Sequence, residues 1–362
     1  MMTCTGRVGA QDQEPPPEHF AAGASWLGRH HLSPYGDVRL RYDRVHDRPG
    51  ATEDLLRIRG RVRGGLVWTP RLGVSLEAGF YSGLWADDDD ALAAPFDNEH
   101  SDSIAVDRLA AVIAPHPTLS ITLGKRPLPL ATSDLTWDSD LRPVGVTVVA
   151  RKAVGAFDEA RVAGAAVRRS EVGADDALLA FQLAYALRPG AARGAEIVMG
   201  FADYSGLDAL AAEGLGRQNR VVTTGSGTRY ANQFRTIEGQ LAGRMQAGHL
   251  LGAAAVHLIH NVEVDQEGDG VRVRGSLGDL AAGSRIEVGY VFQRIEREAL
   301  PGAFNSDDWW FHTRARGHRV WLAVRPVRGV TARLSGFDER RDDVTTPTRR
   351  LLIDLDFELP RD

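Results

Sequence analysis

The sequence predicts an all-β fold, an antiparallel transmembrane β-barrel of about sixteen strands. Three observations predict it. Segments of about ten residues alternate apolar and polar positions, the polar positions carry ionised groups, and the connections between segments alternate between long and short. Because successive side chains of a strand point to opposite faces of its sheet, each segment has one apolar face for lipid and one polar face for water.

Two segments show the alternation clearly. In residues 72–81 every even position is apolar, whereas Glu77 stands on the other parity. In residues 351–359 every odd position is apolar, and the even positions from 354 onward are acidic: Asp354, Asp356 and Glu358. A barrel strand needs only every second residue to be apolar, so the slightly negative mean hydropathy of −0.23 is compatible with this fold.

The composition argues against several other classes of protein. The apolar content of 43% in 362 residues excludes a disordered chain, and the net charge of −5 without a basic stripe gives no reason to expect a nucleic-acid partner. A helical membrane protein is excluded because no run of about eighteen apolar residues occurs. Cys4 is the only cysteine, so neither an internal disulfide nor a thiolate metal cluster can form.

The first 34 residues are expected to precede the barrel, which would occupy residues 35–362. Val8-Gly9-Ala10 resembles the end of a signal peptide, with small residues placed for cleavage before Gln11. We interpret this start as the remnant of an export signal, and the alternative is a tail without a role. Residues 11–34 contain a run of three prolines and are expected to form a flexible lead-in.

The strands follow in order between turn residues. Short turns are expected at 68–71, 115–117, 188–190 and 325–329, and longer polar connections at 82–103, 127–143, 205–230, 261–269, 298–307 and 338–347. Strands are expected to start near residues 37, 55, 71, 104, 118, 144, 157, 177, 194, 231, 248, 269, 284, 309, 328 and 348, with weak alternation at 144, 157 and 269. An even number of strands with short periplasmic turns and long external loops leaves both termini in the periplasm.

Three consecutive motifs carry a more specific resemblance. They are Val-Asp-Arg-Leu-Ala at 106–110, Leu-Gly-Lys-Arg-Pro-Leu-Pro at 123–129, and the stretch at 133–145 that contains Trp-Asp-Ser-Asp-Leu-Arg-Pro-Val-Gly. In this order they resemble a porin family of Gram-negative outer-membrane β-barrels, and the arginine-rich strand at 56–63 is similar to it too. The motifs lie within about residues 55–150. The chain departs from that family in its incomplete signal sequence and in ending on Leu-Pro-Arg-Asp instead of a terminal aromatic residue.

The resemblance implies an outer-membrane channel of a Gram-negative bacterium, without catalytic residues and without a cofactor. Its partners would be outer-membrane lipid and lipopolysaccharide, small hydrophilic solutes or ions, and the barrel-insertion machinery. Porin trimers are common, so the resemblance also suggests a homotrimer.

Parity assigns the residues that would line the pore. Arg57, Arg59, Arg61 and Arg63 share one face of their strand, about 6.6 Å apart in consecutive pairs. Barrel closure places the last strand beside the first, so its acids would lie next to the arginines of the first strand. The full set of expected pore-lining residues is Arg39, Arg41, Arg57, Arg59, Arg61, Arg63, Glu77, Asp354, Asp356 and Glu358.

The arginine ladder of residues 57–63 has two interpretations. It has few obvious acidic partners in the sequence, so it could form a wall that attracts anions. Alternatively, other acids pair with it and the charges only keep the lumen hydrated.

The loop from Pro127 to Gly145 is long enough to fold inward. Its charged and aromatic side chains could form a constriction opposite the arginines: Asp134, Trp137, Asp138, Asp140 and Arg142. A transverse field between acidic and basic walls would then act as a selectivity device. The alternative is an external loop that packs on the barrel rim with its tryptophan as an interfacial anchor.

Other chemistry has little support. The run Asp87–Asp90 lacks the spaced ligands of a calcium loop and is expected to be a solvated loop tip. His257 and His260 lie three apart on an expected strand and point to opposite faces, so they cannot bind one metal ion together. An esterase or protease barrel would need Ser, His and an acid together at the external rim, and strand parity brings no such trio together.

The sequence therefore predicts a porin that lets small hydrophilic solutes diffuse passively, leaves open whether it favours anions, and predicts that the protein is not an enzyme. One alternative is a channel for an anionic polysaccharide, resembling alginate-export barrels. Another is a structural barrel plugged by its own loops.

Overall fold

The computed structural model describes residues 31–71, 73–85, 104–154, 157–168, 176–187, 193–225, 227–248, 250–280 and 283–359. The expected lead-in up to residue 30 and the aspartate run at 87–90 lie outside the described residues. No helix among the described residues is long and apolar enough to cross a membrane.

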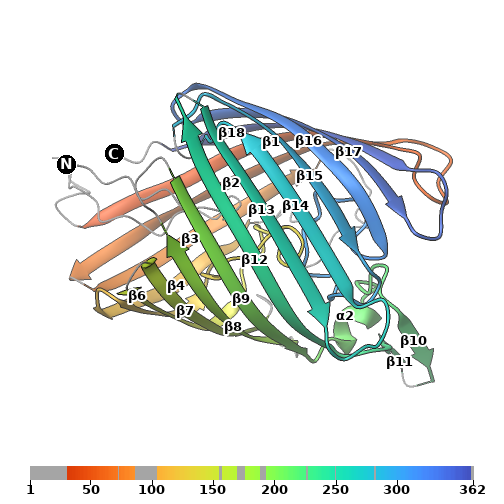
Figure 1. Cartoon of the computed structure of the whole chain (residues 1–362), viewed down its shortest axis with the longest axis horizontal. Coiled ribbons are helices and arrows are strands. Elements are labelled where there is room, and N and C mark those ends of the chain that lie inside the picture. The colour runs from red at the N-terminus through yellow and green to blue at the C-terminus, as the bar shows by residue number, and fades with distance from the viewer. Residues whose placement is uncertain are drawn as a thin grey trace.

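Sixteen antiparallel strands close into one barrel, as predicted (Figure 1). In chain order they are β1 (Leu32–His46), β2 (Leu55–Arg71), β3 (Val74–Trp85), β4 (Ile104–His116), β5 (Leu119–Lys125), β6 (Val144–Val154), β7 (Phe157–Arg168), β8 (Ala177–Leu187), β9 (Arg193–Ser205), β12 (Phe234–Ala247), β13 (Leu250–Asn261), β14 (Asp269–Leu277), β15 (Ile286–Ile295), β16 (Ala315–Val327), β17 (Val330–Arg341) and β18 (Thr348–Glu358). Each strand pairs with the next barrel strand in the chain, and β18 pairs with β1, so the sheet has no free edge.

All sixteen expected strands are present, including β6, β7 and β14, in which alternation is weak. The largest difference is at β16, which begins at Ala315 and not near residue 309, because residues 309–314 belong to a loop. The sequence also gave no sign of the short helix α2 (Asp208–Ala212) or of the hairpin β10–β11 (Val221–Thr224 and Gly227–Tyr230), which interrupt one long connection.

Exposure follows the parity of the strands. On β2, Ile58 is 58% exposed and Arg59 is 5% exposed, so one face points away from the barrel and the other points into it. The same alternation separates exposed Leu40 from buried Arg41 on β1. The outward band is apolar on strand after strand, which is what a lipid-facing surface requires.

Long and short connections lie at opposite ends of the barrel. We name the end with the connections β2–β3, β4–β5, β6–β7 and β16–β17 the short-turn end, and the other the long-loop end. β1 begins and β18 ends at the short-turn end, and α2 with the β10–β11 hairpin lies at the long-loop end (Figure 1). Two connections at the long-loop end, residues 126–143 and 296–314, carry side chains that contact inward-facing side chains of the strands.

Candidate channel lumen

The inward side chains of β18, β1 and β2 form what we name the charged wall. It contains Asp37, Arg39, Arg41, Asp43, Arg57, Arg59, Arg61, Arg63, Arg350, Asp354 and Asp356. The register places Arg41 between Asp354 on β18 and Arg59 on β2. The charges therefore come from three adjacent strands, of which β18 joins β1 and β2 only when the barrel closes.

Closure forms the ion pairs expected for the first and last strands. Arg41 Nε lies 2.6 Å from Asp354 Oδ1, and Arg39 Nε lies 2.9 Å from Asp356 Oδ1. Glu358, the third acid of β18, is exposed at the end of its strand, opposite Asp37 in the register.

The arginine ladder, which has few obvious partners in the sequence, is paired in the structure with acids of the neighbouring strand β1. Asp43, which is fully buried, receives hydrogen bonds from Arg57, Arg59 and Arg350 at 2.6, 2.7 and 2.8 Å. Asp37 accepts from Arg61 at 3.0 Å and from Arg63 at 2.8 Å.

A sequence signal for these two acids existed. Positions 37 and 43 share the inward parity of Arg39 and Arg41, and β1 was expected to lie beside β2. On β3, Glu77 is also buried, and its Oε1 lies 3.5 Å from Arg126.

The connection of residues 126–143, which we name the inward loop, reaches across the barrel. On one side, Asp140 Oδ1 lies 2.8 Å from Arg61 and 3.3 Å from Arg63 on β2. On another side, Asp134 Oδ2 lies 2.6 Å from Arg272 on β14 and 3.6 Å from Arg319 on β16. A loop bonded to β2, β14 and β16 through inward-facing arginines lies within the barrel.

The other expected residues of this loop have mainly structural contacts. Trp137 is buried and its ring stacks on Phe304 with centroids 5.4 Å apart. Asp138 accepts hydrogen bonds from the backbone N–H groups of Asp140 and Asp307 at 2.7 and 3.0 Å. Arg142 Nε lies 3.3 Å from buried Asp107, and its Nη1 donates to the Ser139 carbonyl.

The second loop, residues 296–314, supplies acids that the sequence analysis missed. Asp308 lies 2.8 Å from Arg41, and Asp307 lies 3.7 Å from Arg59. Arg350 also donates to both of their backbone carbonyls, at 2.6 and 2.8 Å. No periodic signal marks these residues, since they belong to a loop.

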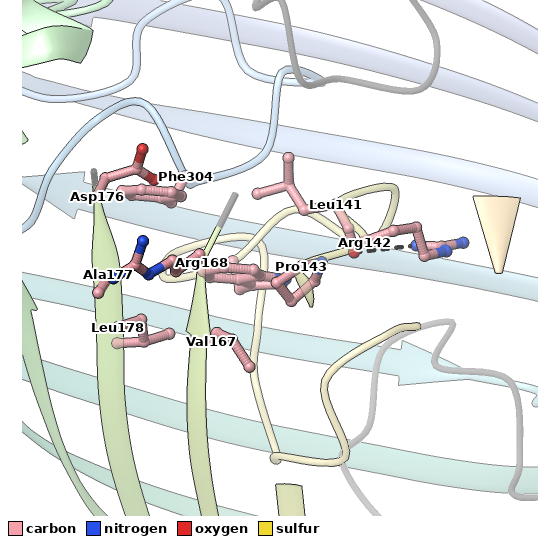
Figure 2. A pocket seen from close by; sticks show the side chains of 10 residues that line it. Leu141, Arg142, Pro143, Val167, Arg168, Asp176, Ala177, Leu178 and Phe304 are labelled. Atoms are coloured by element: carbon pink, nitrogen blue, oxygen red, sulfur yellow. Dashed lines mark hydrogen bonds between the residues drawn. The ribbon is translucent and has the colours of Figure 1, made fainter. Parts of the chain in front are cut away.

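The inward face of β6, β7 and β8 differs sharply from the charged wall. We name it the alanine wall, after its buried small residues Ala163, Ala165, Ala180, Ala184 and Ala186. Three of them pack in one apolar cluster with Leu128, Leu130 and Trp137 of the inward loop. Figure 2 shows a pocket at this junction, where Phe304, Leu141 and Pro143 face Val167 and Leu178.

One constellation joins a serine, a histidine and an acid, a combination that strand parity alone does not bring together. Ser133 Oγ of the inward loop lies 2.7 Å from His257 Nδ1 on β13, and His257 Nε2 lies 2.9 Å from Glu238 Oε2 on β12. Strand parity could not reveal it, because the serine comes from a loop whose path depends on its packing. His260 points away and pairs with Asp269 at 2.7 Å, so the two histidines lie on opposite faces as expected. Among the described residues, no group of three or more His, Cys, Asp or Glu side chains is placed to hold a metal ion.

Solved structures resemble the whole barrel. An outer-membrane protein of Vibrio cholerae, OmpT with its loop L8 deleted, superposes with a TM-score of 0.54 over 91% of this chain and 99% of its own, at 11% identity. The chain has the fold of outer-membrane porins. A substituted form of the Rh. blastica porin superposes with a TM-score of 0.51 over 91% of this chain and all of its own, at 10% identity. No protein-family model and no curated protein matches the sequence.

Proposed function

We propose that the protein is a channel in the outer membrane of a Gram-negative bacterium, through which small hydrophilic solutes and ions diffuse passively. The observation that carries this proposal is the closed sixteen-strand barrel, apolar outside and charged within. A barrel of that strand number is wide enough for an aqueous lumen.

The residues proposed to set the properties of the pore are those of the charged wall and of the inward loop. Their charges compensate one another closely, since Asp37, Asp43, Asp140, Asp354 and Asp356 each contact at least one wall arginine. A balanced wall attracts water and ions of both signs. We therefore expect weak charge selectivity, in place of the strong anion bias that unpaired arginines would give.

The inward loop is proposed to narrow the lumen, because it holds acids against the arginines of β2 and apolar side chains against the alanine wall. The same packing favours a second candidate, a barrel that its own loops plug. The contact of Trp137 with Phe304, which joins the two inward connections, is the specific observation in its favour.

Single-channel recording separates the two candidates. Purified protein, refolded in detergent and added to a planar bilayer, should give discrete conductance steps, and the reversal potential in asymmetric potassium chloride should lie close to zero. If protein that is shown to be folded by its heat-modifiable gel migration gives no conductance step, the channel is rejected and the plugged barrel remains.

A further inference from the structure

The Ser133, His257 and Glu238 constellation has the connectivity of a nucleophile, a base and an orienting acid. The base bonds the serine through one ring nitrogen at 2.7 Å and the acid through the other at 2.9 Å. Such a chain, in which a third group orients the base, is the general signature of an activated nucleophile. A buried histidine bonds both nitrogens in most proteins, so the informative feature here is the order of the groups, a serine hydroxyl on one nitrogen and a carboxylate on the other.

Surrounding side chains hold the three residues in place. His257 is 4% exposed, which limits the rotation of its ring, whereas Ser133 keeps part of its surface open. Gln182 donates to Glu238 Oε1 at 2.6 Å and also bonds the N–H and carbonyl groups of Ala131 at 2.8 and 2.9 Å. One glutamine thus positions both the acid and the segment that leads into the serine.

One backbone group near the serine is consistent with a hydroxyl that donates to His257. Leu135 N–H donates to Ser133 Oγ at 3.2 Å, so the hydroxyl proton is free to point at His257 Nδ1. The matching tautomer carries its proton on Nε2, where Glu238 accepts it. This is the protonation state in which the imidazole can take the serine proton.

We propose that Ser133 is a nucleophile for acyl transfer from small esters that enter the barrel, with His257 as the base and Glu238 as the group that orients it. Ser133 Oγ forms a bond to the ester carbonyl carbon while its proton passes to His257 Nδ1. The bond from carbon to the alcohol oxygen breaks, and the alcohol leaves with that proton. Water then repeats the cycle, which releases the carboxylic acid and restores the hydroxyl.

The test uses a fluorophosphonate, which forms an Oγ–P bond and releases fluoride. Folded protein in detergent is incubated with the reagent, and mass spectrometry locates the adduct. We expect the adduct on Ser133, and we expect labelling to slow about 100-fold or more in Glu238→Gln and in His257→Gln. Ser139→Ala is the matched control, because Ser139 is exposed on the same loop. In this variant Ser133 should be labelled at the original rate.

Two results would overturn the proposal. One is an unlabelled Ser133 in protein whose Ser133→Cys variant reacts with a small maleimide, since the position would then be accessible but not activated. The other is an undiminished rate in His257→Gln. Variants are compared only after heat-modifiable migration shows that the barrel has formed. The measurement needs no conductance, so its result is independent of the channel proposal.

Discussion

The charged wall and the alanine wall enclose the same lumen but are held by different forces. On the charged wall, buried arginines and aspartates of β18, β1 and β2 bond one another. Asp43, for example, accepts hydrogen bonds from three guanidinium groups. On the alanine wall, small side chains of β7 and β8 leave room for the apolar side of the inward loop. Charge pairing tolerates little change in charge, whereas close packing tolerates little change in volume.

The inward loop contacts both walls, so charge pairing and close packing occur within one segment. Asp140 faces Arg61 and Arg63, whereas Trp137 and Leu141 belong to the apolar cluster of the alanine wall. A loop with one charged and one apolar side can be fixed in only one orientation. Substitutions on each wall should therefore have different consequences.

The largest effect is expected on the charged wall. Replacing Asp43 with Asn leaves Arg57, Arg59 and Arg350 buried against one another without their carboxylate and should destabilise the barrel by about 3–5 kcal/mol. Urea unfolding of the refolded barrel measures this. The control is Asp338→Asn, which removes an acid paired with Arg349 on the exposed face and should cost less than about 1 kcal/mol. Equal losses would mean that burial does not govern the pairs.

A smaller effect is expected on the alanine wall. Ala165→Leu adds volume where the inward loop packs and should cost about 1–3 kcal/mol, with a change in single-channel conductance as the loop moves. Its neighbour Ala166 points outward and is exposed, so Ala166→Leu should leave stability and conductance nearly unchanged. If the two leucines have the same effect, the loop does not rest on this wall.

The smallest effect concerns selectivity at the pair between Arg61 and Asp140, which lie 2.8 Å apart. Asp140→Asn leaves surplus positive charge and should shift the reversal potential towards anions, whereas Arg61→Gln should shift it towards cations. The double variant should return close to the original value. Both shifts should shrink near 1 M salt, where screening acts over about 3 Å. Shifts of the same sign would place the pair away from the ion path.

Much of the barrel could be predicted because strand periodicity is local. A period of two fixes which side chains of β1, β2 and β18 share a face, and turn residues fix where each strand ends. That the acids of β18 lie next to Arg39 and Arg41 followed once the barrel was assumed to close, and the structure gives the individual pairs. Asp37 and Asp43 could have been found by the same reasoning, since they share the inward parity of β1.

The sequence by itself thus determined the number of strands, their order and their two faces, because each depends on residues near one another in the chain. Only the tertiary structure decided the contents of the lumen. Asp140 meets Arg61 and Ser133 meets His257 across 79 and 124 residues, and both contacts depend on the path of one loop. A loop has no repeating pattern, so its position follows from the charges and volumes that the assembled walls present to it.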